Sequence, residues 1–275
     1  PFINDDESVA AQKQFEQLEA KYGLDKPLLE QYGIYMKGLL HGDLGDSLIK
    51  KGKSVVEIIG NTAPVTMRLG LTAFAFSMVV GITLGIVAAL SKKRAINNFV
   101  MLLSTIGVSV PNFLLAVFLM LVFGVALNLF PTVGLKTPLH YVLPTIAVSL
   151  HPIAMISRLT RTSMMEVMRQ DYMILAKSKG TSKLKVIVKH GLRNALLPVV
   201  TYAGPLIASL LTGSFVVETL YSIPGIGSEF VSSVTNRDYT LIMGLTIFMG
   251  FLVIVMSLVS DLVAAMVDPR IKLDK

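Results

Sequence analysis

The sequence predicts an all-α protein that crosses a membrane several times. Its mean hydropathy is +0.66, and 53% of its 275 residues are hydrophobic while only 16% are charged. Soluble domains carry about 25% charged residues. Five apolar stretches are also long enough to cross the hydrocarbon core as a helix, which takes about 20 residues. The chain contains no Cys, so disulfides and thiolate metal sites are excluded.

Four of the apolar stretches predict simple spans. They cover residues 69–90, 139–157, 195–217 and 240–267. The remaining stretch, residues 95–135, is too long for one span and too short for two spans with a turn. We therefore expect one long helix from about Asn98 to about Leu127, kinked at Pro111.

The basic residues in the connections between these spans predict the orientation of the chain. The first connection contains Lys92, Lys93 and Arg94, and the third, residues 158–193, carries a net charge of +7, equal to that of the whole chain. The second and fourth connections hold one Lys or Arg each. We therefore expect the first and third connections and the C-terminus to be cytoplasmic.

This orientation places the N-terminal segment outside the cell. We expect an extracytoplasmic helical segment at residues 1–61, with helices at 8–22 and 27–40, and a transmembrane core at 62–268. A cytoplasmic tail follows at 269–275. Because the external segment has to be carried across the membrane, we expect a sixth hydrophobic helix ahead of it, or else a cleaved signal peptide.

The most basic stretch is AKSKGTSKLKVIVKHGLRN, residues 176–194, with six Lys or Arg and no acid. It belongs to a cytoplasmic loop, residues 158–194, which we call the elbow. Apolar residues at helical spacing predict that the third span continues into this loop as an amphipathic helix, with Leu159, Met165, Met168, Tyr172 and Leu175 on one face.

The elbow should contain a sharp break between two helices. Gly180 is placed to end the first helix in a left-handed conformation, and Thr181 or Ser182 is placed to cap the second. Two helices separated by a sharp break would project from the membrane, and a projection of this kind suits insertion into a partner protein. Attraction of its basic residues to anionic lipid head groups is the alternative.

The motifs of this loop resemble a known family. DYMILAKSKG at 171–180, followed by LRNALLPVV at 192–200, is similar to the loop signature of permease subunits of binding-protein-dependent ATP-driven importers, in the oligopeptide, dipeptide and nickel branch. The resemblance runs nearly the whole length of the chain. Its other motifs are GDLGDS at 42–47, SVPNF at 109–113, ETLYSIPGIG at 218–227 and DPRI at 268–271.

The resemblance implies a type I ABC importer permease fold, in which the elbow is the coupling helix that docks on an ATPase subunit. Ala176 and Gly180 match the family signature, whereas Ile174 and Leu175 stand where the wider superfamily has Glu and Ala. The residues expected to couple to the ATPase are Asp171, Ala176, Lys177, Lys179, Gly180, Thr181, Ser182 and Lys183.

The same resemblance implies a translocation subunit for di- or oligopeptides in a bacterial or archaeal cell membrane, with nickel complexes as an alternative substrate. The partners would be membrane lipid, a homologous second permease, two ATP-binding subunits and an extracytoplasmic substrate-binding protein, with no nucleic acid. This chain would hold no cofactor, since ATP and Mg²⁺ bind to the ATPase subunits.

Small and kink-forming residues in the spans are candidates for the substrate path. They are Gly81, Gly85, Ser109, Pro111, Asn112, Thr201, Gly204 and Pro205. Close packing of helices through small residues is the alternative for each. Pro224, Gly225 and Gly227 are candidates for an outer gate or a docking surface, with an ordinary turn as the alternative.

Other chemistries find little support in the sequence. KKGKS at 50–54 lacks the Gly that a phosphate-binding loop requires at position 47, where Ser47 stands. The four His residues are not spaced as metal ligands on one helix face, so neither an enzyme nor a metal site is expected. An ion-coupled secondary transporter needs ionisable groups deep in the membrane. Only His151 and Asp261 qualify, and Asp261 lies near the cytoplasmic end of its span.

Overall fold

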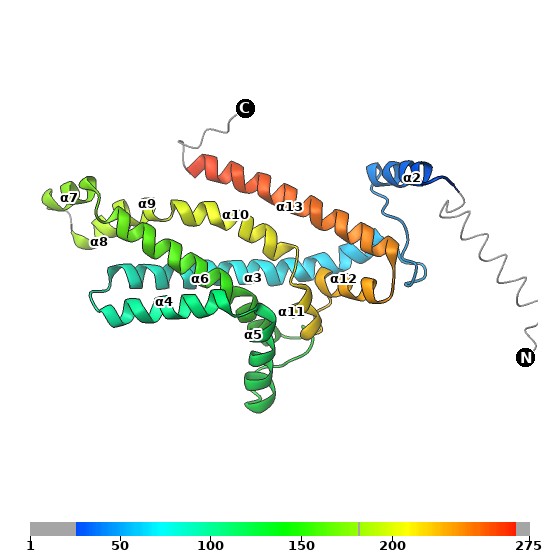
Figure 1. Ribbon diagram of the computed structural model, residues 1–275, viewed down its shortest axis with the longest axis horizontal. Helices are drawn as coiled ribbons and strands as arrows, with labels where there is room; N and C mark the ends of the chain where they lie inside the picture. Colours follow the sequence, from blue (N-terminus) through cyan, green and yellow to red (C-terminus); the bar gives the residue numbers. More distant parts are fainter. Residues whose placement is uncertain (1–25, 181, 268–275) are drawn as a thin grey trace, which may run out of the picture.

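The computed structural model describes residues 26–180 and 182–267, which form an elongated bundle of helices (Figure 1). Within this part of the chain, four helical segments are long and apolar enough to cross a membrane, and a bent helix pair raises the number to five if it counts as one span. The expected helix at 8–22 and the tail at 269–275 lie outside the described residues. The helix expected at 27–40 is confirmed as α2 (Leu28–Leu40).

The first span is longer than expected. Helix α3 (Val55–Leu90) begins 14 residues before position 69, where Ser54 caps it by accepting a hydrogen bond of 3.1 Å from the backbone N–H of Glu57. Its 36 residues span about 54 Å at 1.5 Å per residue, against about 30 Å for the hydrocarbon core. The helix also contains Pro64. Its first part therefore extends beyond the membrane.

The second span breaks into two helices rather than bending gently. Helix α4 (Arg94–Ser109) and helix α5 (Asn112–Leu119) meet at 104°, and a π-helix, Met120–Ala126, continues α5. Figure 1 shows α5 running across the long axis of the bundle. Pro111 causes the break because its ring disfavours helical geometry at the preceding residue, and Val110 is accordingly extended, with φ −85° and ψ 122°. The predicted interruption at Pro111 is confirmed, but the prediction of one helix that is only kinked there was wrong.

The later spans agree with the sequence at most of their ends. A short 3₁₀-helix, Pro138–Tyr141, leads into α6 (Val142–Val167), and α13 (Tyr239–Val267) matches the last predicted span. The fourth span divides into α10 (Leu197–Leu211) and α11 (Phe215–Leu220). The division falls at Gly213, whose φ of +91° ends the helix. The fourth connection contains another helix, α12 (Ile226–Thr235).

Helices α3 and α6 form the centre of the bundle and pack extensively along each other. A Cβ on Gly81 would lie 2.8 Å from the side chain of Ile156, and one on Gly85 would lie 2.5 Å from that of Thr160. Only Gly lets the two backbones approach this closely. Gly81 and Gly85 therefore serve helix packing, and their assignment to the substrate path is corrected.

Two clusters of buried apolar side chains stabilise the two ends of the bundle. The larger cluster lies in the membrane bundle and includes Leu69, Leu143, Ile156 and Leu206. The smaller cluster joins the start of α3 to α12 and α13 at the other end of the bundle. Its buried members are Leu44, Val55, Ile58, Ile59, Ala63, Ile226, Leu241 and Leu245. We call residues 26–63 with residues 221–245 the outer module, after the side of the membrane on which the sequence analysis expects them.

Candidate functional site

The elbow lies at one end of the long axis of the bundle, and the outer module lies at the opposite end (Figure 1). The elbow contains α7 (Asp171–Ser178), α8 (Lys183–Lys185), a π-helix at Val186–Leu192, and α9 (Arg193–Ala195). Residues 168–170 form a break between α6 and α7. The third span therefore runs on into the elbow as predicted, but only as far as Val167. Asp171 starts a new helix, where an acid is favourable.

The Gly180 prediction is confirmed. Gly180 has φ +76°, the left-handed region, and no atom lies within 4 Å of the position that its Cβ would occupy. The break therefore depends on backbone conformation and not on lack of space. Ser182 precedes α8, and its carbonyl accepts a hydrogen bond of 3.0 Å from the N–H of Val186. Thr181 lies outside the described residues.

Within the elbow, methionine side chains attach α7 and the π-helix to the end of α6. Met173 and Val186 are fully buried. The Cβ position of Gly191 lies 3.2 Å from Met164 Cε, 3.4 Å from Met173 Cε and 3.5 Å from Met168 Sδ. Flexible thioether side chains suit such an irregular contact.

The apolar stripe expected on this face was wrong at its far end. Tyr172 and Leu175 are 40% and 56% exposed, and Met173 is buried in their place. The break after Val167 shifts the phase of the helix, so a stripe counted straight through it points the wrong way.

The outer surface of the elbow combines apolar and basic side chains. Ile174, Leu175, Leu184 and Val188 are each more than half exposed. The exposed residues Asp171, Lys185 and Lys189 lie on the helices of the elbow, and the exposed Lys179 lies in the turn after α7. Ala176 is half-buried. Lys177 and Lys183 belong to α7 and α8. A projecting tip of this kind can bury apolar surface in a partner while charged groups surround the contact.

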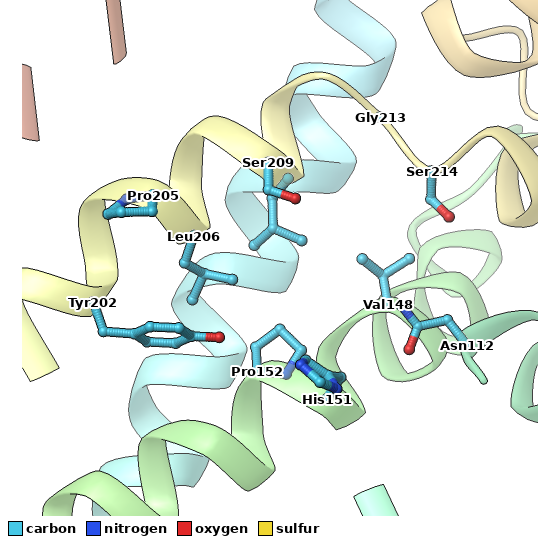
Figure 2. Close-up of a pocket in the computed structure, with 11 residues that line it drawn as sticks. Asn112, Val148, His151, Pro152, Tyr202, Pro205, Leu206, Ser209, Gly213 and Ser214 are labelled. Atoms are coloured by element: carbon cyan, nitrogen blue, oxygen red, sulfur yellow. The ribbon is translucent and has the colours of Figure 1, made fainter. Parts of the chain in front are cut away.

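A cavity of about 380 Å³ lies in the membrane bundle between α6, α10 and the start of α5 (Figure 2). Figure 2 shows Tyr202 reaching from α10 toward His151 and Pro152 of α6. Gly213 and Ser214, at the break between α10 and α11, line one end of the cavity (Figure 2). Its lining residues are Asn112, Val148, His151, Pro152, Tyr202, Pro205, Leu206, Ser209, Leu210, Gly213 and Ser214.

Two of the predicted path residues, Asn112 and Pro205, line this cavity. Ser109, Pro111 and Thr201 are exposed but do not belong to its lining. Gly204 is buried against Ser260 of α13, and a Cβ there would collide with that side chain. Gly204 is thus a packing residue, and its assignment to the substrate path is corrected.

The sequence analysis missed most of the polar lining of the cavity. Tyr202, Leu206 and Ser209 recur at helical spacing on the face of α10 that also carries Pro205. This i, i+4, i+7 pattern could have identified them as one face. The residues on α6 could not be found in this way, because their pairing with α10 depends on how the two helices pack.

The outer turn is organised around a buried carboxylate. Glu218 of α11 is fully buried, and its Oε1 accepts a hydrogen bond of 3.1 Å from the Thr66 hydroxyl of α3. Its Oε2 accepts bonds of 2.8 Å and 3.2 Å from the N–H groups of Gly227 and Ser228 at the start of α12. Glu218 therefore joins three helices. The sequence analysis missed it, since a single acid in a loop motif looks exposed.

The glycines that were expected to form an outer gate make room for this carboxylate. A Cβ on Gly225 would collide with Glu218 and Thr66, and one on Gly227 would lie 3.0 Å from Glu218 Oε2. Gly213 approaches from the other side, where a Cβ would lie 2.6 Å from Oε1. Pro224 is exposed beside them.

A second carboxylate, Asp238, fixes the loop before α3 to the start of α13. Its oxygens accept hydrogen bonds from the Ser47 hydroxyl and, at 3.1 Å and 3.2 Å, from the N–H groups of Leu48 and Leu241. Burial alone raises the pKa of this carboxyl, but the hydrogen bonds outweigh burial, so the pKa of Asp238 lies below its ordinary value. An ion pair between Lys50 and Glu229 adds a contact nearby. We call Ser47 and Asp238 the clamp.

No group of three or more His, Cys, Asp or Glu residues in the described ranges could hold a metal ion. His140 instead hydrogen-bonds through Nδ1 to the Thr137 hydroxyl at 2.9 Å, and His41 Nδ1 lies 2.8 Å from the Lys37 carbonyl.

Comparison with known proteins gives a consistent result. Residues 81–273 match the model of a family described as binding-protein-dependent transport system inner membrane component. The chain is 47% identical over 258 residues to the dipeptide transport system permease protein DppB of Bacillus subtilis (strain 168), covering 94% of this chain and 84% of that protein. It is 39% identical over 260 residues to the oligopeptide transport system permease protein OppB of Escherichia coli (strain K12), covering 93% and 84%.

Solved structures support the fold. A chain of the MetNI methionine ABC transporter in an inward-facing conformation is similar with a TM-score of 0.62 at 15% identity, covering 77% of this chain and 96% of that one. A chain of an amino acid ABC transporter crystallised with histidines gives 0.56 at 14% identity, covering 78% and 94%. At such identities the likeness concerns the arrangement of helices alone.

Proposed function

The chain belongs to the family of binding-protein-dependent transport system inner membrane components, and we propose that it is the translocation subunit of an ATP-driven importer of di- or oligopeptides. The observation that carries the peptide substrate is the similarity, over nearly the whole chain, to permeases named for dipeptide and oligopeptide transport. Nickel complexes remain the alternative substrate, and an ion-coupled secondary transporter is the alternative mechanism.

The energy in this proposal comes from outside the chain. Two ATP-binding subunits bind ATP and Mg²⁺, and the elbow docks on one of them. The fixed turn at Gly180 and the methionine contacts with α6 support this role, because motion of the docked tip would pass directly to a membrane helix. Asp171, Lys179 and Ser182 are the described polar residues placed to contact the ATPase.

The orientation in this proposal follows from the two ends of the bundle. The basic elbow faces the cytoplasm, and the outer module faces the outside and receives a substrate-binding protein. The exposed Pro224 and the loop at the clamp belong to the docking surface, while Gly225 and Gly227 lie buried behind them against Glu218. A homologous second permease packs against this chain to complete the pathway, since one chain supplies half of the helices.

The test is reconstitution of the complete complex in vesicles, with peptide-loaded binding protein outside and ATP inside. We expect uptake of radiolabelled dipeptide that requires ATP and is unaffected by ionophores which collapse proton and sodium gradients. This chain purified alone should show no ATPase activity. Uptake driven by an ion gradient without ATP would establish secondary transport instead, and uptake of nickel complexes but no peptide would change the substrate.

A further inference from the structure

The cavity between α6 and α10 presents hydrogen-bonding groups in an apolar frame. Its walls are made by Val148, Pro152, Leu206 and Leu210. Its polar side chains are Asn112, His151, Tyr202, Ser209 and Ser214. None of the described residues that line it is an Asp, Glu, Lys or Arg. At about 380 Å³ the cavity falls within the range of about 300–1,000 Å³ that is typical of small-molecule sites.

The polar groups of the cavity are available to a ligand. Within the described part of the chain, none of these five side chains hydrogen-bonds to another residue. Hydroxyl and amide groups can each donate and accept. Pro152 also lacks the N–H that would normally bond to the carbonyl of Val148, and both residues line the cavity.

A site with this chemistry recognises peptide bonds in preference to charged groups. Each peptide bond offers one N–H donor and one carbonyl acceptor, and neither carries a charge that needs a partner. A buried charge without a partner costs far more than a buried amide that is hydrogen-bonded. Di- and oligopeptides of different sequence share their peptide bonds and their charged termini, and of these two features the uncharged lining of the cavity suits the peptide bonds.

We propose that this cavity is a binding site within the membrane for the peptide bonds of the transported substrate, held by Tyr202 and His151 from opposite walls (Figure 2). The inference rests on the proposed function, because the ligand is the peptide that the complex imports. It adds a site in the permease that is distinct from recognition by the external binding protein. Asn112, Ser209 and Ser214 extend the hydrogen bonding along the cavity.

The first measurement uses Tyr202→Phe and His151→Leu in the reconstituted complex, with binding protein saturated with dipeptide. Tyr202→Phe keeps the ring and removes the hydroxyl. We expect the turnover of peptide uptake to fall about fivefold in each variant, which is the effect of losing one hydrogen bond. Tyr239→Phe is the matched control, because that tyrosine is exposed at the start of α13 and lies outside the cavity.

The second measurement reports occupancy directly and uses the absence of Cys from the chain. Ser209→Cys places a single thiol in the cavity, where Ser209 is exposed. We expect peptide-loaded binding protein to slow labelling of this thiol by a small maleimide at least about threefold during turnover. Thr235→Cys, exposed on α12 outside the cavity, should label at the same rate with and without peptide.

The outcomes separate this inference from the proposed function. If the unmodified complex imports no peptide, the proposed function fails. If it imports peptide while Ser209→Cys labels at an unchanged rate, the function stands and the cavity is not a binding site. If peptide protects the thiol but neither Tyr202→Phe nor His151→Leu lowers turnover, peptide passes the cavity without being recognised there, which also overturns the proposal.

Discussion

Ser47 and Asp238 are separated by 191 residues, yet the Ser47 hydroxyl donates a hydrogen bond to the Asp238 carboxylate. This contact joins the loop before α3 to the turn before α13. Because both residues are buried, the contact is protected from water. The clamp thus ties together two segments of the outer module that lie far apart in the sequence.

The clamp should weaken at low pH. The pKa of Asp238 is below its ordinary value in the folded protein, so the carboxylate stabilises the fold above about pH 4, and this contribution is lost as the pH falls through the folded pKa. Asp238→Asn should lower the stability by about 1–3 kcal/mol at neutral pH. The difference from the unmodified protein should shrink below about pH 4, as measured by thermal unfolding in detergent.

The control for this prediction is Asp261→Asn, which removes an exposed carboxylate from α13. It should leave the unfolding temperature unchanged over the same pH range. A gap between Asp238→Asn and the unmodified protein that stays constant down to pH 3 would show that the carboxylate charge is not what stabilises the clamp.

Glu218 should tolerate an amide but not truncation. Glu218→Ala leaves the N–H groups of Gly227 and Ser228 without their acceptor, at a cost of about 1–3 kcal/mol for each buried group. Glu218→Gln retains an acceptor for these N–H groups, and its NH2 group can donate to the Thr66 hydroxyl in place of the bond that Thr66 donates to Glu218. Thermal unfolding of the purified chain should place Gln clearly closer than Ala to the unmodified protein. Equal losses for the two variants would contradict the hydrogen-bonding role.

Adding a single methyl group at Gly85 should destabilise the protein. Gly85→Ala introduces a Cβ 2.5 Å from Thr160 Cβ and 2.7 Å from the Ser157 carbonyl, so α3 and α6 have to separate. Overpacking of this kind costs about 1–3 kcal/mol. Gly60→Ala is the control in the same helix, since nothing lies within 4 Å of its Cβ position and Ala favours helix by about 1 kcal/mol. The two variants should shift the unfolding temperature in opposite directions.

Gly180 should control coupling rather than folding. Gly180→Val forces a β-branched residue into φ +76°, which costs about 1–3 kcal/mol and realigns the tip of the elbow. Uptake and the stimulation of ATP hydrolysis by binding protein should fall, while membrane insertion is retained. Gly180→Asn should keep more activity, because Asn adopts the left-handed region more easily.

A different variant tests the alternative that the elbow binds anionic lipid head groups. Neutralising Lys183, Lys185 and Lys189 together should impair transport only in vesicles of anionic lipid if the elbow serves the membrane surface. Normal coupling in Gly180→Val, together with that lipid-dependent defect, would refute docking on an ATPase.

The sequence predicted the features that depend on local patterns. The limits of α2 and α13 follow from apolar periodicity, and the left-handed conformation of Gly180 follows from its place after a helix. The N-terminal extension of α3 was missed because apolar contacts with the outer module, and not hydropathy, stabilise it. Pro111 indicated an interruption, but its 104° angle depends on where α5 packs.

The candidate functional regions also differ in whether local sequence or helix packing determines them. The elbow could be found because its charge and its Gly are visible in one short stretch. The cavity could be found only in part, since Tyr202 and His151 face each other through the packing of α6 on α10. Glu218 could not be found, because its burial results from the approach of three helices.

Helix α3 passes from one apolar cluster to the other, and Pro64 stands at the crossing. Ala63 belongs to the cluster of the outer module, whereas Leu69 belongs to that of the membrane bundle. Pro64 cannot donate the backbone hydrogen bond of its position. Helix α3 therefore resists bending least at Pro64. A force on the outer module would tilt this module as a unit about Pro64, while the part of α3 in the membrane bundle stays straight.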